Sequence, residues 1–260
     1  MNVFKLSERL RNVAALIKKG NVVADIGTDH AYLPIHIVNS GISDNVIAMD
    51  VRKGPLEKAK QNVRDYGADG NISIRLSDGL ASLYPMEAET ITICGMGGRL
   101  IKTILENGRD KYNNQTQLIL SPQSELREFR QYLYSFGYSV QKEIILKEDG
   151  QFYFIFCCYR DGQTDYGMYF SKKDYVYKET ALRYGIELLN EKNECLKEYL
   201  EREYSLTEQV YETVKSFADN NKAENAETDT AVSKEAALKA RLDDLEFDLK
   251  CIERALEFYK

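Results

Sequence analysis

A short apolar run near the start of the chain ends in two acids and a glycine, as is typical of a strand that leads into a ligand-binding turn. Residues 22–29 read Val-Val-Ala-Asp25-Ile-Gly27-Thr28-Asp29. In a dinucleotide-binding domain this turn reads G-x-G-x-x-G, and its second glycine lets backbone N–H groups approach a pyrophosphate. Asp29 takes that second position. Its carboxylate would repel a diphosphate, because two like charges about 4 Å apart cost on the order of 4 kcal/mol near a protein surface.

The turn therefore predicts a nucleoside ligand that carries no phosphate. S-adenosylmethionine fits this description, because it joins adenosine to a sulfonium and an ammonium group that tolerate a nearby carboxylate. We expect Asp25, Gly27 and Thr28 to contact this cofactor. The alternative from another class is a nicotinamide-dependent oxidoreductase, which the carboxylate of Asp29 disfavours.

Acids also follow the next two apolar runs. Asp50 lies 23 residues after Gly27, where an acid that holds the ribose hydroxyls is expected. Ser77-Asp78-Gly79 then supplies an acceptor beside a flexible backbone, and we expect Asp78 and Gly79 to meet the amino group of adenine. A helix cap at Asp50 and an ordinary Asp-Gly turn at Asp78 are the alternatives without a ligand.

A glycine-rich loop follows the fourth apolar run. It reads Cys94-Gly95-Met96-Gly97-Gly98-Arg99, and glycines there permit a flat base or a transferred methyl group to approach the backbone. We assign Gly95 and Met96 to the cofactor and Gly97 and Gly98 to the substrate, with a turn of no function as the alternative. A last loop carries predicted substrate contacts that could also serve as a helix cap, Ser121, Pro122 and Gln123.

The elements that must position these residues alternate between buried strands and helix-length connections. Five apolar runs predict parallel strands at Val22–Ile26, Val46–Met49, Ile72–Leu76, Thr90–Cys94 and Gln117–Leu120. Two more strands, Tyr138–Leu146 and Gln151–Tyr159, flank an Asp-Gly turn at 147–150 and predict an antiparallel hairpin. A mostly parallel seven-stranded sheet that ends in a hairpin is the Rossmann-like architecture of class I methyltransferases.

The composition changes near Lys172 to Glu, Lys, Leu and Tyr, and we place an S-adenosylmethionine-binding catalytic domain at 1–162 and a helical domain at 163–260. Apolar residues repeat at alternating spacings of four and three from Leu238 to Tyr259, and a similar stripe starts at Leu182 and is interrupted at Asn193. The polar segment Ala218–Ala231 predicts an exposed loop between two long antiparallel helices. We expect this antiparallel coiled coil to pack on itself in a monomer, with dimerisation through the stripe as the alternative.

Composition restricts the class of protein further. The net charge of −6 comes from the tail, because residues 1–160 hold 20 Lys and Arg against 18 Asp and Glu, so a nucleic-acid partner remains open. No apolar segment reaches the length of a membrane span, and the N-terminal 19 residues show helical spacing instead, so we expect a cytoplasmic protein with no membrane partner. The five cysteines form no C-x-x-C pair and are expected to be reduced, with no metal site.

The motifs together resemble those of one family, the bacterial tRNA (adenine-22-N1)-methyltransferases known as TrmK. The resemblance covers essentially the whole chain and rests on four motifs: Leu6-Ser-Glu-Arg-Leu10, Asp25-Ile-Gly-Thr-Asp-His-Ala-Tyr-Leu-Pro34, Gly95-Met-Gly-Gly98 and Ser121-Pro-Gln123. It implies a Rossmann-like S-adenosylmethionine domain, a coiled-coil C-terminal domain, and methylation of N1 of an adenine in the D-arm of tRNA.

The implied reaction assigns roles to several residues. Adenine N1 has a free lone pair but becomes part of a cationic base, so a carboxylate that faces the purine stabilises the developing charge. Asp29 is our catalytic candidate, with capping of the first helix after the strand as its alternative role. Tyr32 could stack on a flipped adenine. Basic residues on the first tail helix could follow the tRNA phosphates, among them Lys172 and Lys173. A non-catalytic RNA-binding adaptor that keeps a nucleoside pocket is the remaining alternative.

Overall fold

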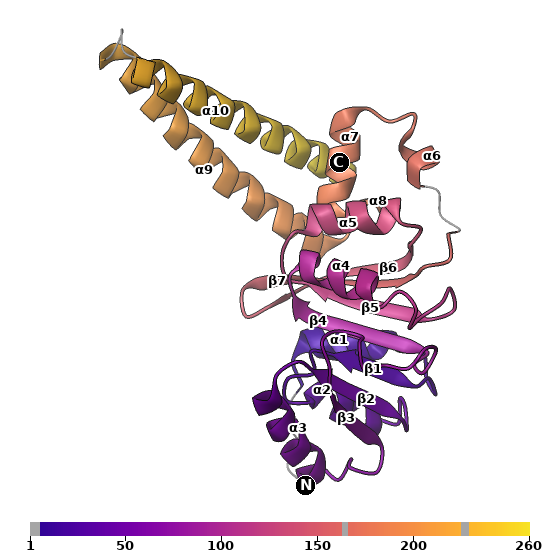
Figure 1. Cartoon of the computed structure of the whole chain (residues 1–260). Helices are drawn as coiled ribbons and strands as arrows, with labels where there is room; N and C mark the ends of the chain where they lie inside the picture. Colours follow the sequence, from indigo (N-terminus) through magenta and orange to yellow (C-terminus); the bar gives the residue numbers. More distant parts are fainter. Residues whose placement is uncertain (1–5, 163–165, 225–228) are drawn as a thin grey trace. The chain divides into compact units, whose positions relative to one another are not determined.

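The computed structural model describes residues 6–162, 166–224 and 229–260. The chain forms two compact units, Met1–Ser171 and Lys172–Lys260 (Figure 1). The boundary predicted between residues 162 and 163 adjoins residues 163–165, which lie outside the described residues. Each unit is described by itself below.

The first unit contains one seven-stranded sheet in the order β3-β2-β1-β4-β5-β7-β6. The first five strands pair in parallel and the last two pair antiparallel, so the predicted architecture is confirmed. The strands are β1 (Val23–Ile26), β2 (Val46–Asp50), β3 (Ile72–Leu76), β4 (Thr90–Met96), β5 (Gln117–Pro122), β6 (Ser139–Glu148) and β7 (Gln151–Tyr159).

Helices cover both faces of the sheet, which is why the central strands consist of continuous apolar residues. Every residue of β1, β2 and β5 is buried. The helices of this unit are α1 (Glu8–Leu16), α2 (Tyr32–Asn39), α3 (Lys53–Asp65), α4 (Gly98–Asn107), α5 (Leu126–Ser135) and α6 (Tyr166–Phe170). The packing of α1 with α2 and of α2 with α3 joins three helices into one layer, and α4 packs against α5.

The strand order reverses between β1 and β4. The chain moves from β1 to β2 and β3 on one side, then returns to β4 beside β1 and continues to β5 on the other side. Right-handed crossovers in opposite directions place their helices on opposite faces and open a crevice at the carboxyl ends of the two central strands. This crevice holds the candidate site.

A tight turn connects β6 and β7. Asp149 and Gly150 have φ angles of 49° and 77°, the left-handed conformation that a two-residue hairpin turn requires. The strands pair from Glu148 opposite Gln151 to Ser139 opposite Tyr159. The predicted antiparallel hairpin is therefore confirmed.

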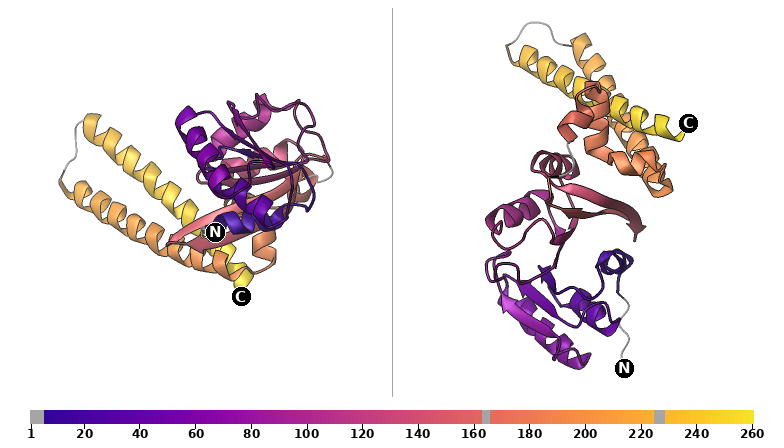
Figure 2. Two further views of the ribbon diagram at one scale, coloured as in Figure 1. Left: turned by 90° about the horizontal axis from the view of Figure 1, so that it is seen from below. Right: turned by 90° about the vertical axis from the view of Figure 1, so that its right-hand side faces the viewer.

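The second unit is helical. It comprises α7 (Tyr175–Tyr184), α8 (Ile186–Asn190), α9 (Glu194–Glu224), α10 (Asp229–Leu256) and a final 3₁₀ turn at Glu257–Tyr259. Figure 2 shows α9 and α10 side by side as a helical hairpin, in agreement with the contacts between them. Leu245 and Ile252 of the predicted α10 stripe are buried, while Arg183 and Asp248 connect α7 to α10 through an ion pair of 2.8 Å.

The prediction of one long first tail helix is wrong. The chain breaks at Gly185, which has a φ of 82°, and again at Lys192, which has a φ of 50°. Asn193 then accepts a hydrogen bond from the backbone N–H of Leu196 at 3.1 Å and so caps α9. The basic residues predicted on one helix are consequently distributed over α7, α9 and the segments before them.

The predicted loop at Ala218–Ala231 is also wrong over its described part. Helix α9 continues to Glu224 and α10 begins at Asp229, whereas 225–228 lie outside the described residues. The segment contains no glycine or proline that would interrupt a helix. Its polar residues can therefore form solvated turns of α9 and α10, which are stabilised by the packing of these two helices elsewhere. Among the described residues, no helix combines the length and the apolar character that a membrane span requires.

Candidate functional site

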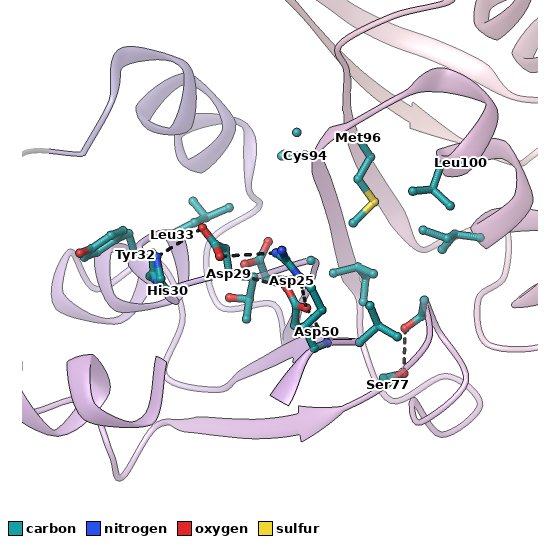
Figure 3. A pocket seen from close by; sticks show the side chains of 18 of the residues that line it. Asp25, Asp29, His30, Tyr32, Leu33, Asp50, Ser77, Cys94, Met96 and Leu100 are labelled. Atoms are coloured by element: carbon teal, nitrogen blue, oxygen red, sulfur yellow. Dashed lines mark hydrogen bonds and ion pairs between the residues drawn. The ribbon is translucent and has the colours of Figure 1, made fainter. Parts of the chain in front are cut away.

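A cavity of about 490 Å³ lies at the carboxyl ends of β1, β2 and β4, at the reversal of strand order. The described residues that line it include every residue predicted to bind the cofactor, together with Asp29, Tyr32 and Gln123. Figure 3 shows Tyr32 and His30 on one side of it and Met96 and Leu100 on the other. The predicted cofactor residues on its wall are Asp25, Gly27, Thr28, Asp50, Asp78, Gly79, Gly95 and Met96.

The turn between β1 and α2 adopts an unusual backbone conformation. Gly27, Asp29 and Ala31 have φ angles of 73°, 52° and 59°. A Cβ atom at Gly27 would also lie 2.2 Å from Cε of Met96, so a side chain there would require the flexible end of Met96 to move. Helix α2 begins at Tyr32 after Ala31, and no side chain caps it. Asp29 therefore does not cap α2, which was the alternative role considered for it.

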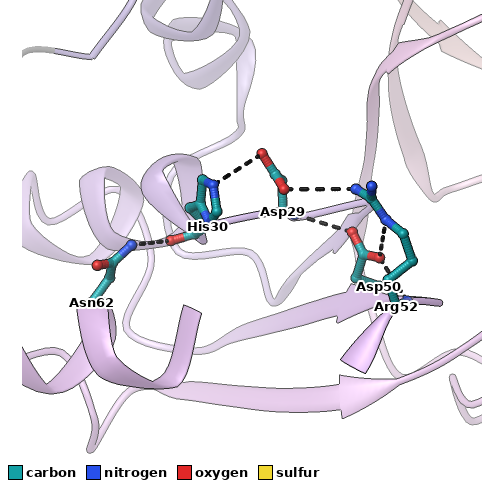
Figure 4. A network of polar contacts seen from close by, with 5 residues as sticks. All are labelled: Asp29, His30, Asp50, Arg52 and Asn62. Atoms are coloured by element: carbon teal, nitrogen blue, oxygen red, sulfur yellow. Dashed lines mark hydrogen bonds and ion pairs between the residues drawn. The ribbon is translucent and has the colours of Figure 1, made fainter. Parts of the chain in front are cut away.

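Asp50 is the centre of a polar network at the end of β2 (Figure 4). Its side chain is buried, and its two oxygens accept hydrogen bonds from the backbone N–H groups of Asp29, at 3.2 Å, and Arg52, at 2.9 Å. The Asp29 carboxylate is 56% exposed at the rim of the cavity. It lies 3.7 Å from Nε2 of His30 and 3.7 Å from a guanidinium nitrogen of Arg52.

Asp25 supplies a buried carboxylate to the floor of the cavity. The Thr92 hydroxyl donates a hydrogen bond of 2.6 Å to its Oδ1 atom. Burial raises the pKa of Asp25, and the hydrogen bond from Thr92 opposes that effect only in part. Burial likewise raises the pKa of the neighbouring Cys94 thiol to about 12, so this cysteine is a thiol at neutral pH.

The loop after β3 is folded tightly around Ser77. The Ser77 hydroxyl donates to the backbone oxygen of Gly79 at 2.8 Å and accepts from the N–H of Ser82 at 3.0 Å. Gly79 has a φ of 53°, and a Cβ atom there would lie 3.1 Å from Ile104 of α4. Asp78 is exposed between these two anchored residues and lines the cavity.

The predicted substrate residues fall into different environments. Gly97 and Gly98 do not line the cavity. A Cβ atom on Gly98 would lie 2.9 Å from the backbone oxygen of Ser124, so packing requires a glycine there, whereas the atom at 2.9 Å from a Cβ on Gly97 is the Ser124 hydroxyl, which can rotate away. Ser121 and Pro122 are buried in β5 and also lie outside the lining. Gln123 does line it, and its backbone N–H donates to the oxygen of Met96 at 2.9 Å. Lys172 and Lys173 are exposed and belong to the second unit.

Sequence reasoning left several lining residues without a role toward the cofactor: Arg9, Leu10, Val51, Arg52, Cys94, Leu100 and Ile104. Arg9 lies in the Leu6–Leu10 motif, so a signal for it existed, although nothing local indicates that α1 reaches the ends of β1 and β4. The cysteines of the chain are free thiols. In the described part of the chain, no group of three or more His, Cys, Asp or Glu side chains is arranged to hold a metal ion.

Comparison with known proteins agrees with the motifs and the fold. The sequence model of the tRNA (adenine(22)-N(1))-methyltransferase family, TrmK, matches residues 23–237. The Bacillus subtilis protein of that name is 38% identical over 219 residues, which are 84% of this chain and 90% of that protein.

Solved structures of similar proteins have the same fold along nearly the whole chain. The crystal structure of the B. subtilis m1A22 tRNA methyltransferase TrmK has a TM-score of 0.74 at 34% identity, covering 95% of this chain and all of that one. Streptococcus pneumoniae Sp1610, in complex with S-adenosyl-L-methionine, has a TM-score of 0.71 at 33% identity, covering 92% of this chain and all of that one. The chain therefore belongs to the tRNA (adenine(22)-N(1))-methyltransferase family.

Proposed function

We propose that this chain transfers the methyl group of S-adenosylmethionine to N1 of an adenine, at position 22 in the D-arm, of tRNA. Family membership supports the reaction. The observation that carries the proposal is the cavity at the reversal of strand order, in which Asp25, Asp50 and Asp78 face a single space. Three carboxylates suit a nucleoside that bears a sulfonium and an ammonium group, and they disfavour a diphosphate.

The residues on the wall fit this cofactor. Each oxygen of Asp50 accepts one backbone N–H and retains lone pairs for the ribose hydroxyls. The glycine at position 27 leaves the backbone open to a ligand beside the end of the Met96 side chain. A volume of about 490 Å³ lies within the range of small-molecule sites. When bound, S-adenosylmethionine supplies an electrophilic methyl group on its sulfonium.

The chain's contribution to the reaction is positioning and charge. Adenine N1 attacks with its own lone pair, so no general base is required, and alignment of N1 with the methyl group at about 3–3.5 Å provides most of the rate. Asp29 is the catalytic candidate, because its carboxylate stands exposed at the rim and could face the purine as positive charge develops. Arg52 and His30 lie beside it and orient it.

Two further rim residues suit the target base. Tyr32 is 37% exposed at the start of α2, and its ring meets His30 edge-on at 5.9 Å. A base extruded from the tRNA could stack on this ring, and Gln123 on the opposite side offers an amide for its polar edge. Ser121 and Pro122 contribute through the shape of the β5 end, since their side chains are buried.

The helical domain, which we assign to 163–260, contributes the phosphate contacts of the larger substrate. Lys172 and Lys173 are exposed before α7 and supply positive charge in an otherwise acidic C-terminal segment. We propose that the catalytic domain at 1–162 and this helical domain act together in a monomer, without a metal. A tRNA substrate supports the expectation of a cytoplasmic protein.

Mapping the methylated nucleotide tests the proposal. The full chain is incubated with methyl-labelled S-adenosylmethionine and an unmodified tRNA transcript, and a transcript in which the adenine at position 22 is replaced by guanine serves as control. We expect label at N1 of that adenine in the first transcript and none in the second. Cofactor binding without methylation of any RNA would favour the adaptor, and tighter binding of NAD than of S-adenosylhomocysteine would favour the oxidoreductase.

A further inference from the structure

An ion pair outside the cofactor cavity closes the loop that carries Asp78. Arg75 lies on β3, and Glu87 lies shortly before β4. Their side chains meet through two parallel contacts, Nη2 to Oε1 at 2.6 Å and Nη1 to Oε2 at 2.8 Å. The two side chains are only 26% and 22% exposed. A bidentate and partly shielded pair of this kind is stronger than an ordinary surface ion pair, so it joins the two ends of the loop firmly.

Both partners of this pair also hold the backbone inside the loop. Nη1 of Arg75 donates a further hydrogen bond, at 3.2 Å, to the backbone oxygen of Ser82. Oε2 of Glu87 accepts from the backbone N–H of Tyr84 at 2.9 Å, and the Ser82 hydroxyl donates to the oxygen of Leu76 at 3.0 Å. The hydrogen bonds from Arg75 lower the pKa of Glu87, so the pair stays ionised at neutral pH. The ion pair and the loop backbone thus form one network.

This network reaches the two residues that flank Asp78. The Ser82 N–H donates to the Ser77 hydroxyl at 3.0 Å, and that hydroxyl, at one end of the cavity in Figure 3, donates to the oxygen of Gly79 at 2.8 Å. The Ser77 N–H donates to the backbone oxygen of Asp50 at 2.9 Å. Asp78 is exposed, and its carboxylate has no hydrogen-bond or ion-pair partner among the described residues. The backbone on either side of Asp78 therefore decides where this carboxylate lies.

We infer that the Arg75–Glu87 ion pair positions Asp78 to accept a hydrogen bond from the amino group of adenine, and that it thereby sets the affinity of the site for the nucleoside end of the cofactor. The inference rests on the proposed function, because it concerns the same cofactor. A hydrogen bond weakens steeply when its geometry departs from the optimum, and a loop that must become ordered on binding lowers affinity. Arg75 and Glu87 do not line the cavity, so both are positioning residues.

Calorimetry on the full chain with two ligands tests the inference. S-adenosylhomocysteine carries the 6-amino group of adenine, whereas an analogue with purine in place of adenine lacks only that group. The wild type should bind S-adenosylhomocysteine more tightly than the purine analogue. Arg75→Gln should weaken S-adenosylhomocysteine about 3- to 10-fold, as expected for the partial loss of a hydrogen bond to a charged group. Its affinity for the purine analogue should equal that of the wild type, and Glu87→Gln should show the same selectivity.

A double-mutant cycle measures whether the ion pair acts through Asp78. Asp78→Ala removes the acceptor, so the ion pair then has no carboxylate left to position. Arg75→Gln should therefore cause no further weakening of S-adenosylhomocysteine when Asp78→Ala is already present. If the two residues contributed independently, their effects on the dissociation constant would multiply instead.

Lys60→Gln is the matched control. Lys60 also makes a short ion pair, at 2.7 Å with Glu57 on α3, and does not line the cavity, so its replacement should leave both affinities unchanged. If Arg75→Gln lowers the melting temperature, Arg75→Lys repeats the test, because it retains the positive charge but not the two parallel hydrogen bonds. The loss should again be confined to S-adenosylhomocysteine.

The possible outcomes separate this inference from the proposed function. Equal weakening of both ligands by Arg75→Gln, or of neither, would show that the ion pair serves the stability of the fold alone and would overturn the inference. Multiplying effects of Arg75→Gln and Asp78→Ala would also overturn it. Equal affinity of the wild type for the two ligands would remove the contact between Asp78 and adenine while leaving the cofactor in place. A wild-type chain that binds neither ligand would refute the cofactor assignment itself.

Discussion

The backbone N–H of Asp29 donates a hydrogen bond of 3.2 Å to the side chain of Asp50, so the catalytic candidate is held by the residue proposed to bind the ribose. The two acids are 21 residues apart: Asp29 lies in the turn after β1, and Asp50 is the last residue of β2. Because Asp29 has a φ of 52°, this hydrogen bond also helps to maintain a backbone conformation that few residues adopt. Changes at Asp50 should therefore affect both cofactor affinity and the position of Asp29.

Asp50→Ala should weaken binding of S-adenosylhomocysteine about 10- to 100-fold, because the ribose loses a charged acceptor. Turnover at saturating cofactor should also fall, since the N–H of Asp29 loses its partner. Titration calorimetry gives the first effect and methylation kinetics the second. Asp44→Ala, an exposed acid before β2 that does not line the cavity, is the control. An unchanged dissociation constant in a folded Asp50 variant would place the ribose elsewhere.

Asp29→Asn should lower the single-turnover rate about 10²- to 10³-fold, because it preserves the shape of the side chain but removes the charge that stabilises the cationic product. Cofactor affinity should change much less. Asp78→Asn provides the contrast, since a contact to adenine of the cofactor should alter affinity more than rate. A near-normal single-turnover rate for Asp29→Asn, together with weak cofactor binding, would show that Asp29 serves the cofactor and not the reaction.

Asp25→Asn should raise the melting temperature of the cofactor-free protein at pH 7 and weaken cofactor binding. The pKa of Asp25 is raised in the folded state, so its ionised form opposes folding above that pKa. The difference in melting temperature between the variant and the wild type should shrink as the pH falls through this raised pKa. It should vanish below the pKa of Asp in the unfolded chain, which is about 3.9. In a chain of this size, each 1 kcal/mol in the free energy of unfolding corresponds to about 2–4 °C in melting temperature. An unchanged or lower melting temperature at pH 7 would contradict the prediction.

The double variant Lys172→Glu, Lys173→Glu should weaken tRNA binding and leave S-adenosylhomocysteine affinity unchanged. Loss of two phosphate contacts should make the plot of the logarithm of the tRNA binding constant against the logarithm of the salt concentration less steep. The slope should change by about 1.8, as expected for two contacts with duplex nucleic acid. Lys250→Glu is a control with the same change at a single site, because Lys250 already pairs with Glu246 at 2.9 Å on α10. Equal tRNA affinity for the double variant and the wild type would remove these lysines from the interface.

The sequence alone determined the sheet and one end of the candidate site. Runs such as Val46–Met49 are local signals, and parallel strands bring their carboxyl ends to one edge, so Asp25, Asp50 and Asp78 had to converge once the strands were identified. The turn at Asp149-Gly150 could likewise be predicted from its own two residues. Polar helices were harder to predict, because a solvated helix and a loop share the composition of 218–231.

Only the tertiary structure decided which distant residues share the cavity. Arg9 reaches it because Glu148 and Tyr153, about 140 residues later, fix the start of α1. The burial of Ser121 and Pro122 and the packing of Gly98 against Ser124 depend likewise on neighbours that no local pattern names. Contacts of this kind depend on how separate elements pack, and the spacing of residues along the chain carries no information about them.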